Sequence, residues 1–172
     1  AAGASGIVWF PVMLSRDDRP GNSREEGILR KMSAEPAAGV PTESPFHSLI
    51  VPIESLSKAA RGFGNVAAVP DPDGIYRRLP LFSDYRGAKV PILGISIYRS
   101  LEGGRGPGAT GAATPPLDGE GRFLITYYGG EPDRSRLSAY QVIRSSLALE
   151  RGETPAVDPD AMKGKIVFIG YT

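Results

Sequence analysis

Segments with helical periodicity alternate with short apolar segments along most of this chain. The apolar segments are rich in Val, Ile and aromatic residues, as β-strands are. Five are expected to form strands: residues 7–14, 65–69, 75–82, 122–130 and 163–172. Three other segments are expected to form helices: residues 52–64, 90–104 and 137–149. This alternation predicts an α/β fold, with a mixed β-sheet flanked by helices in a single layered domain over residues 1–172.

Residues at the helix ends support these assignments. Pro52 suits a first helical turn and Gly62 suits a helix stop, while Ser138 is expected to act as an N-cap. The middle helix is mostly apolar and is expected to pack on the sheet. Its apolar positions are Ile92, Leu93, Ile97 and Leu101.

Three polar or glycine-rich stretches are expected to be loops. Residues 15–27 are charged and turn-rich, which predicts an exposed loop in which Glu25 and Glu26 are solvated. Residues 33–45 contain three prolines. Residues 103–121 are low in complexity and predict a flexible surface loop.

The overall composition excludes several classes of function. Twenty basic residues nearly balance nineteen acidic ones, so no basic field indicates nucleic-acid binding. The chain has no cysteine, which excludes disulfides, thiolate metal sites and cysteine nucleophiles. The single histidine, His47, lacks a nucleophile motif and is interpreted as structural. No apolar run reaches the roughly 18 residues of a membrane span.

The sequence "VPDPDGIYRRLPLF" at residues 69–82 is the most distinctive motif. Asp71, Pro72 and Gly74 occupy the first, second and fourth positions of a type I turn. The side chain of Asp71 can accept hydrogen bonds from nearby backbone N–H groups. Local turn chemistry therefore explains this part of the motif without any ligand.

The two arginines after the turn leave more than one interpretation open. If residues 75–82 form one strand, Arg77 shares a face with apolar side chains, where a guanidinium needs an acid or an anion. Asp71 and Asp73 are the nearest acids and predict a structural Arg–Asp clasp. Alternatively, Arg77 or Arg78 binds an anionic ligand.

A calcium loop is the third interpretation of the same motif. The required oxygen ligands are missing, because Ile75 and Phe82 stand at two of the expected positions. Elsewhere, Tyr127 is expected to pack in the core or to line a ligand site. The sequence predicts no catalytic residue, no metal site and no cofactor.

Several blocks, in this order, resemble the CHASE type 2 domain, the cyclase- and histidine-kinase-associated sensory extracellular domain. They are "GFGNVAAVPDPDGIYRRLPLF", "VPILGISIYRSL", "RFLITYYGG", "LSAYQVI" and "MKGKIVFIGYT". The blocks lie within residues 52–172, and residues 6–14 resemble a strand of the same domain. The motif positions are Asn65, Asp71, Asp73, Gly74, Arg77, Arg78 and Pro80.

The resemblance implies a sensor domain outside the cytoplasmic membrane of a bacterial receptor. Flanking membrane helices, absent from this chain, would connect it to a cytoplasmic adenylate or guanylate cyclase, histidine kinase or serine/threonine kinase. Such a domain senses a small-molecule or envelope ligand and does not catalyse a reaction.

The family normally has a further N-terminal section, which is missing here because it was trimmed, lost or left out. If the sheet needs those strands, its unpaired edge predicts a homodimer or a swapped assembly. Two other functions remain open from the sequence. One is a small α/β hydrolase-like enzyme, and the other is a structural dimerisation module of an envelope protein.

Overall fold

The computed structural model describes residues 8–32, 40–101, 115–127 and 136–170. The chain divides into two compact units, Ala1–Thr126 and Tyr127–Thr172. The described residues form four α-helices, one short 3-10 helix and eight strands. The predicted mixed α/β fold class is therefore confirmed.

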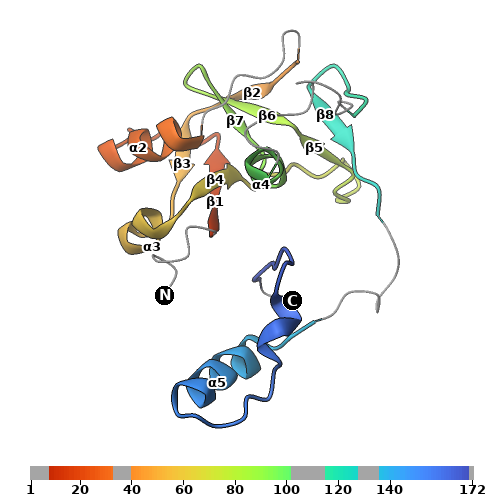
Figure 1. Cartoon of the computed structure of the whole chain (residues 1–172). Helices are drawn as coiled ribbons and strands as arrows, with labels where there is room; N and C mark the ends of the chain where they lie inside the picture. Colours follow the sequence, from red (N-terminus) through yellow and green to blue (C-terminus); the bar gives the residue numbers. More distant parts are fainter. Residues whose placement is uncertain (1–7, 33–39, 102–114, 128–135, 171–172) are drawn as a thin grey trace. The chain divides into compact units, whose positions relative to one another are not determined.

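The strands of the first unit form three small sheets (Figure 1). The first sheet has the order β3 (Ser48–Ile50), β1 (Trp9–Ser15), β4 (Gly62–Asn65). The second has the order β2 (Glu43–Phe46), β6 (Phe82–Tyr85), β7 (Ala88–Pro91). The third pairs β5 (Arg78–Pro80) with β8 (Arg122–Leu124). Strand β1 is antiparallel to β3 and parallel to β4, so the first sheet is mixed as predicted.

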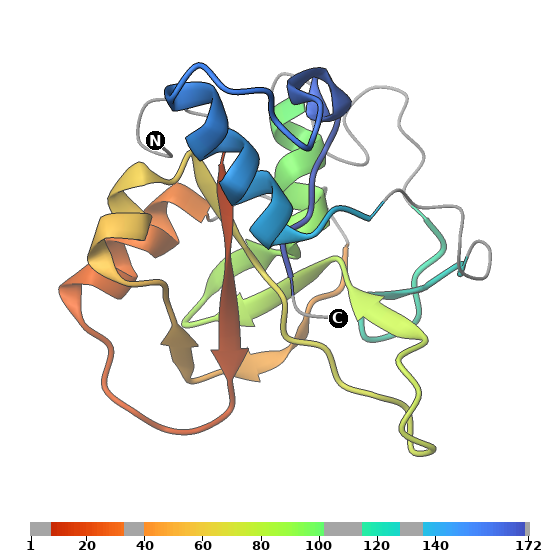
Figure 2. The same cartoon turned by 90° about the horizontal axis from the view of Figure 1, so that it is seen from below.

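Helices cover both faces of the first sheet. Helices α2 (Ser23–Met32) and α3 (Glu54–Ala59) lie on one side of β1, and α4 (Leu93–Leu101) lies on the other (Figure 2). The alternation of side chains along β4 explains this arrangement. Phe63 joins the core with residues of α2, whereas the next residue, Gly64, faces α4.

Gly64 permits an unusually close approach of α4 to the sheet. A Cβ atom at this position would lie 2.3 Å from the Cα atom of Leu93, at the start of α4. No L-residue with a side chain fits that distance without movement of the helix. The glycine thus fixes the spacing between β4 and α4.

The core of the first unit contains residues of both three-stranded sheets and of helix α2. In β1, Val12 and Leu14 are buried while Pro11 and Met13 are exposed, the alternation expected of a half-buried strand. The cluster of buried residues comprises Val12, Leu14, Ile28, Met32, Phe46, Leu49, Ala60, Phe63, Tyr85 and Val90.

The prediction of an exposed loop over residues 15–27 is wrong at its C-terminal end. Helix α2 begins at Ser23, because Asn22 and Glu25 form a reciprocal N-terminal cap. The backbone N–H of Glu25 donates to Asn22 Oδ1 over 3.0 Å, and Asn22 Nδ2 donates to Glu25 Oε1 over 2.9 Å. Glu25 is only 2% exposed and pairs with Arg19 at 2.8 Å, so it is not solvated.

Two predicted strands have different limits in the structure. Strand β4 ends at Asn65, so residues 66–69 are not strand. The predicted strand over residues 75–82 is two strands, β5 and β6, separated at Leu81. The break occurs because the two strands pair with different partners, β5 with β8 and β6 with β2 and β7.

The last two predicted strands are also shorter or absent. Strand β8 ends at Leu124, and residues 163–170 form no strand. Phe168 and Ile169 are 78% and 93% exposed. A strand needs a neighbouring strand to accept and donate its backbone hydrogen bonds. The described residues of the second unit include no such strand, so the apolar sequence of residues 163–170 is not sufficient to form one.

The second unit consists of α5 (Ala139–Glu150) and the 3-10 helix η1 (Pro159–Met162). Ser138 occupies the predicted N-cap position, but its side chain makes no capping hydrogen bond. The Oγ atom of Ser145 accepts a 2.9 Å hydrogen bond from the N–H of Val157, which ties the following loop to the helix.

The predicted flexible loop lies mostly outside the described residues, which resume at residue 115. There, the Asp118 carboxylate accepts hydrogen bonds from the N–H groups of Glu120 and Arg122. Gly121 has a positive φ of 76°, and a Cβ atom there would lie 2.1 Å from the carbonyl oxygen of Pro41. This end of the segment is a hydrogen-bonded turn.

Candidate functional site

The acidic turn of the distinctive motif forms as predicted. The N–H of Gly74 donates to the carbonyl oxygen of Asp71 over 2.8 Å, which closes a four-residue turn. Gly74 has a φ of 82°, a conformation that glycine adopts without steric cost. The N–H of Asp71 donates to the carbonyl of Ile75 over 3.0 Å, which adds a second backbone hydrogen bond across the loop.

The Arg–Asp ion pairs predicted from the sequence are present at this turn. The Asp71 carboxylate is shared, accepting from Arg77 at 3.3 Å and from Arg78 at 2.8 Å. Arg77 also pairs with Asp73 at 2.8 Å. We call these four residues, Asp71, Asp73, Arg77 and Arg78, the clasp. Both guanidinium groups have acidic partners, so the clasp needs no ligand to satisfy them.

The expectation that Arg77 lies on a buried apolar face is wrong. Its side chain is 39% exposed. A buried Arg77 requires one continuous strand over residues 75–82, whereas β5 begins only at Arg78 and Arg77 lies before it. The hydrogen bond from Arg77 lowers the pKa of Asp73 to about 2, and the backbone N–H of Ile75 contributes in the same direction.

Replacement of Asp71 by alanine is expected to destabilise the protein more than replacement of Asp73. Asp71 is the shared acceptor and its side chain is only 14% exposed, whereas Asp73 is 53% exposed. We expect a loss of about 1–2 kcal/mol for Asp71→Ala. The loss for Asp73→Ala is expected to be smaller, because solvent screens its ion pair. Urea unfolding measures both. Equal stability of the two variants would contradict the clasp.

Asn65, another motif residue, is fully buried and joins two sheets. Its Oδ1 atom accepts from the N–H of Leu14 in β1 at 3.2 Å and from the N–H of Ala67 at 2.9 Å. Its Nδ2 atom donates to Ser83 Oγ in β6 at 3.3 Å. The residue therefore connects the first sheet to the second. Pro80, the last motif residue, is buried at the end of β5.

The remaining predicted ligand residue, Tyr127, belongs to the second unit and is 69% exposed. It follows the end of β8 and does not take part in the sheet, so the strand alternation that predicted core packing does not apply. Its neighbour Tyr128 lies outside the described residues. A ligand-binding role for Tyr127, Arg77 or Arg78 stays a prediction.

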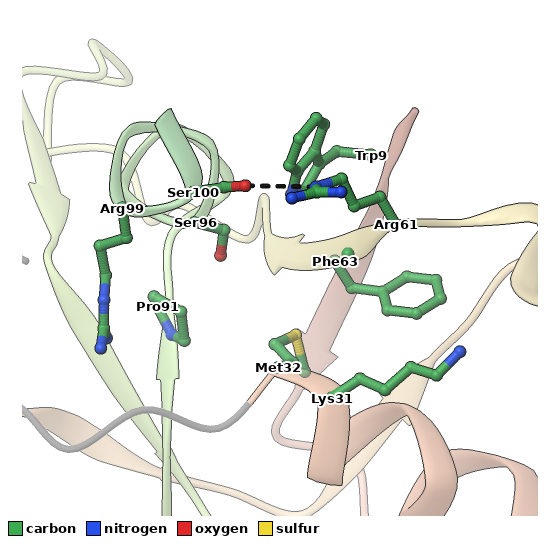
Figure 3. A pocket seen from close by; sticks show the side chains of 10 residues that line it. Trp9, Lys31, Met32, Arg61, Phe63, Pro91, Ser96, Arg99 and Ser100 are labelled. Atoms are coloured by element: carbon green, nitrogen blue, oxygen red, sulfur yellow. Dashed lines mark hydrogen bonds between the residues drawn. The ribbon is translucent and has the colours of Figure 1, made fainter. Parts of the chain in front are cut away.

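A pocket of about 450 Å³ lies in the first unit, where α4, β4 and α2 meet (Figure 3). Five elements, β1, α2, β4, β7 and α4, and the residue before β4 supply its described lining. These residues are Trp9, Lys31, Met32, Arg61, Gly62, Phe63, Pro91, Ser96, Arg99 and Ser100. Helix α4 supplies three of the pocket's polar side chains, those of Ser96, Arg99 and Ser100.

One wall of the pocket combines an indole ring, a guanidinium and a hydroxyl. The guanidinium carbon of Arg61 lies 5.8 Å from the ring centroid of Trp9, within cation–π range. Its Nε atom donates to Ser100 Oγ over 3.4 Å (Figure 3). Gly62 leaves room for the indole, since a Cβ atom there would lie 2.6 Å from Trp9 Nε1.

The pocket is positively charged along its described lining. Lys31, Arg61 and Arg99 contribute three cations, and none of the described lining residues is acidic. Figure 3 shows Arg99 along the side opposite Phe63, with the hydroxyl of Ser96 directed into the space between them. The Oγ atom of Ser96 is buried and has no hydrogen-bond partner among the described residues.

Sequence reasoning did not identify this pocket, since its residues are widely separated along the chain. It also missed the burial of Glu25, although the pattern Asn22-x-x-Glu25 is a capping signal that predicts a helix start. No comparable local signal marks Arg61 or Arg99.

Within the described ranges, no helix has the length and apolar character required to cross a bilayer. The same part of the chain brings together no group of three or more His, Asp or Glu side chains that could hold a metal ion.

The fold and the pocket define a small α/β domain with a cavity of ligand size. The family model described as the CHASE2 domain matches residues 4–172, nearly the whole chain, and the chain belongs to this family. CHASE2 domains are extracellular sensory domains of signalling receptors and are generally not catalytic. No curated protein and no solved structure matches the chain.

Proposed function

We propose that this chain is the extracytoplasmic input domain of a bacterial transmembrane receptor that controls a cytoplasmic adenylate or guanylate cyclase or a protein kinase. The observation that carries the proposal is the family match over residues 4–172. Membrane helices flanking the domain connect it to the output. The clasp and Asn65 serve as structural braces in this account.

Signalling in this account is a shift between two packings of the domain. A ligand changes the balance only through its different affinities for the two packings. Helix α4 is a suitable moving element, because it lines the pocket with three polar side chains and also packs on β4. A small movement of α4 would change the pocket and the sheet surface together.

We also propose that the domain forms a homodimer. Strand β3 lies at the edge of its sheet, and no described strand pairs with its outer side. Met13 and Ile50 face each other across β1 and β3 and are 46% and 48% exposed. A second copy could pair with the free edge of β3 and cover these two apolar side chains. Light scattering at high protein concentration is expected to give twice the 18.2 kDa chain mass, and a monomer mass would contradict the proposal.

The experiment that tests the output compares the full-length receptor with a variant lacking residues 4–172, both in membrane vesicles. Cyclic nucleotide formation from ATP and GTP, and protein phosphorylation, are measured in each. We expect one of these activities in both preparations, at different levels, because the input domain biases the output. A receptor with none of the activities, or with an activity unaffected by the deletion, would contradict the proposal.

A further inference from the structure

The pocket described above has the dimensions of a small-molecule site. Its volume of about 450 Å³ falls within the roughly 300–1,000 Å³ of typical ligand pockets. At about 30 Å³ per water, it holds the equivalent of roughly 15 water molecules. Buried apolar residues, Met32, Phe63 and Pro91, form part of its described lining and give it a firm base.

The charge of the pocket differs from that of the whole chain. The chain carries a net charge of only +1, whereas the described lining has three cations and no acid. Neither Lys31 nor Arg99 makes an ion pair within the described part of the chain. A cleft lined by charges of one sign concentrates its electric field and attracts ions of the opposite sign.

The polar groups of the pocket match the needs of anionic oxygens. Arg61 and Arg99 offer planar guanidinium donors, which suit carboxylate and phosphate groups. Ser96 contributes a buried hydroxyl with no partner among the described residues, which a bound acceptor would satisfy. Ser100 stands beside Arg61 as a further donor.

We propose that this pocket binds a small anion bearing two or more negatively charged oxygens, as carboxylate or phosphate groups. Arg99 and Arg61 hold the charged groups, Ser96 and Ser100 donate hydrogen bonds, and Lys31 adds to the attractive field. The site gives the proposed sensor function a ligand class. Residues of α4, β4 and α2 line this pocket, so a bound anion contacts all three elements and favours one packing of them.

Trp9 makes the proposal directly measurable, because it is the only tryptophan of the chain and it lines the pocket. The full 172-residue chain is titrated with citrate as the carboxylate probe and inorganic pyrophosphate as the phosphate probe. Glucose is the neutral control. An anion that engages Arg61 alters its stacking on the indole, so tryptophan fluorescence is expected to change and to saturate with citrate or pyrophosphate.

Variants separate specific binding from general charge attraction. Arg99→Gln is expected to weaken binding by roughly tenfold to hundredfold, the range for one charge-assisted hydrogen bond. Arg99→Lys, which keeps the charge, is expected to recover part of the affinity. Arg144→Gln is the matched control: its guanidinium also lies 5.8 Å from an aromatic ring, that of Tyr140, but in the second unit. This control is expected to bind like the unmodified chain.

Circular dichroism and thermal unfolding establish that each variant is folded before its titration is interpreted. The proposal is overturned if neither probe gives a saturable change up to about 10 mM, where even a millimolar Kd would be detected. It is equally overturned if glucose acts like the anions, or if folded Arg99→Gln binds as tightly as Arg144→Gln. These titrations use the isolated chain, whereas the output experiment uses the full-length receptor. A failure of anion binding can therefore be distinguished from a failure of the proposed receptor function.

Discussion

Replacement of Gly64 by alanine is expected to lower the free energy of unfolding by about 3 kcal/mol or more. The added Cβ atom would lie 2.3 Å from the Cα atom of Leu93 and 2.7 Å from its backbone nitrogen. Both atoms belong to backbone, so no side-chain rotation relieves the overlap. Helix α4 must move away from β4, which opens the packing between them. Urea unfolding of the purified chain measures the loss.

Gly94 provides the matched control within α4 itself. A Cβ atom at Gly94 meets nothing within 4 Å, and alanine favours the helix by roughly 1 kcal/mol relative to glycine. Gly94→Ala is therefore expected to be neutral or stabilising. If Gly64→Ala were as stable as Gly94→Ala, the close contact between α4 and β4 would be contradicted. Movement of α4 should also weaken anion binding, because the helix carries Ser96 and Arg99.

Replacement of Asn65 by leucine is expected to cost about 3 kcal/mol, the second large effect. Leucine has a similar size but makes none of the three side-chain hydrogen bonds of Asn65. The N–H groups of Leu14 and Ala67 and the hydroxyl of Ser83 would lose their asparagine partner. Buried donors without acceptors carry a large desolvation cost.

Ser83→Ala is the control for this second prediction. It removes only the 3.3 Å hydrogen bond between the sheets and leaves the two backbone donors satisfied. We expect a cost of about 1 kcal/mol. Chemical denaturation of both variants gives the comparison. A loss for Asn65→Leu no greater than that for Ser83→Ala would show that Asn65 does not connect the sheets as described.

Local chemistry made much of the fold predictable. The alternation of apolar segments predicted the α/β class, because side-chain periodicity directly encodes which face is buried. The turn at Asp71 and Gly74 and the ion pairs to Arg77 and Arg78 were predictable for a similar reason. All of their partners lie within seven residues of one another.

Features that depend on long-range packing were not predictable. Residues 75–82 divide into two strands because the pairing partner changes between β5 and β6. The partners are distant in sequence: Arg78 of β5 pairs with Leu124, 46 positions away. The burial of Glu25 depends on Arg19 and on a fold that brings the helix start against the core. The pocket was missed because β1, α2, β4, β7 and α4 meet only in three dimensions.

Maleimide labelling of intact spheroplasts reports whether the sensory domain faces outward. The chain has no cysteine, so Asp18→Cys, at an exposed position, introduces a single thiol into it. In the full-length receptor, a membrane-impermeant maleimide is expected to label Asp18→Cys on intact spheroplasts, above the background of the unmodified receptor. The buried Ser83→Cys variant should react only after denaturation. Labelling of Asp18→Cys only after the membrane is permeabilised would place the domain in the cytoplasm and contradict the account.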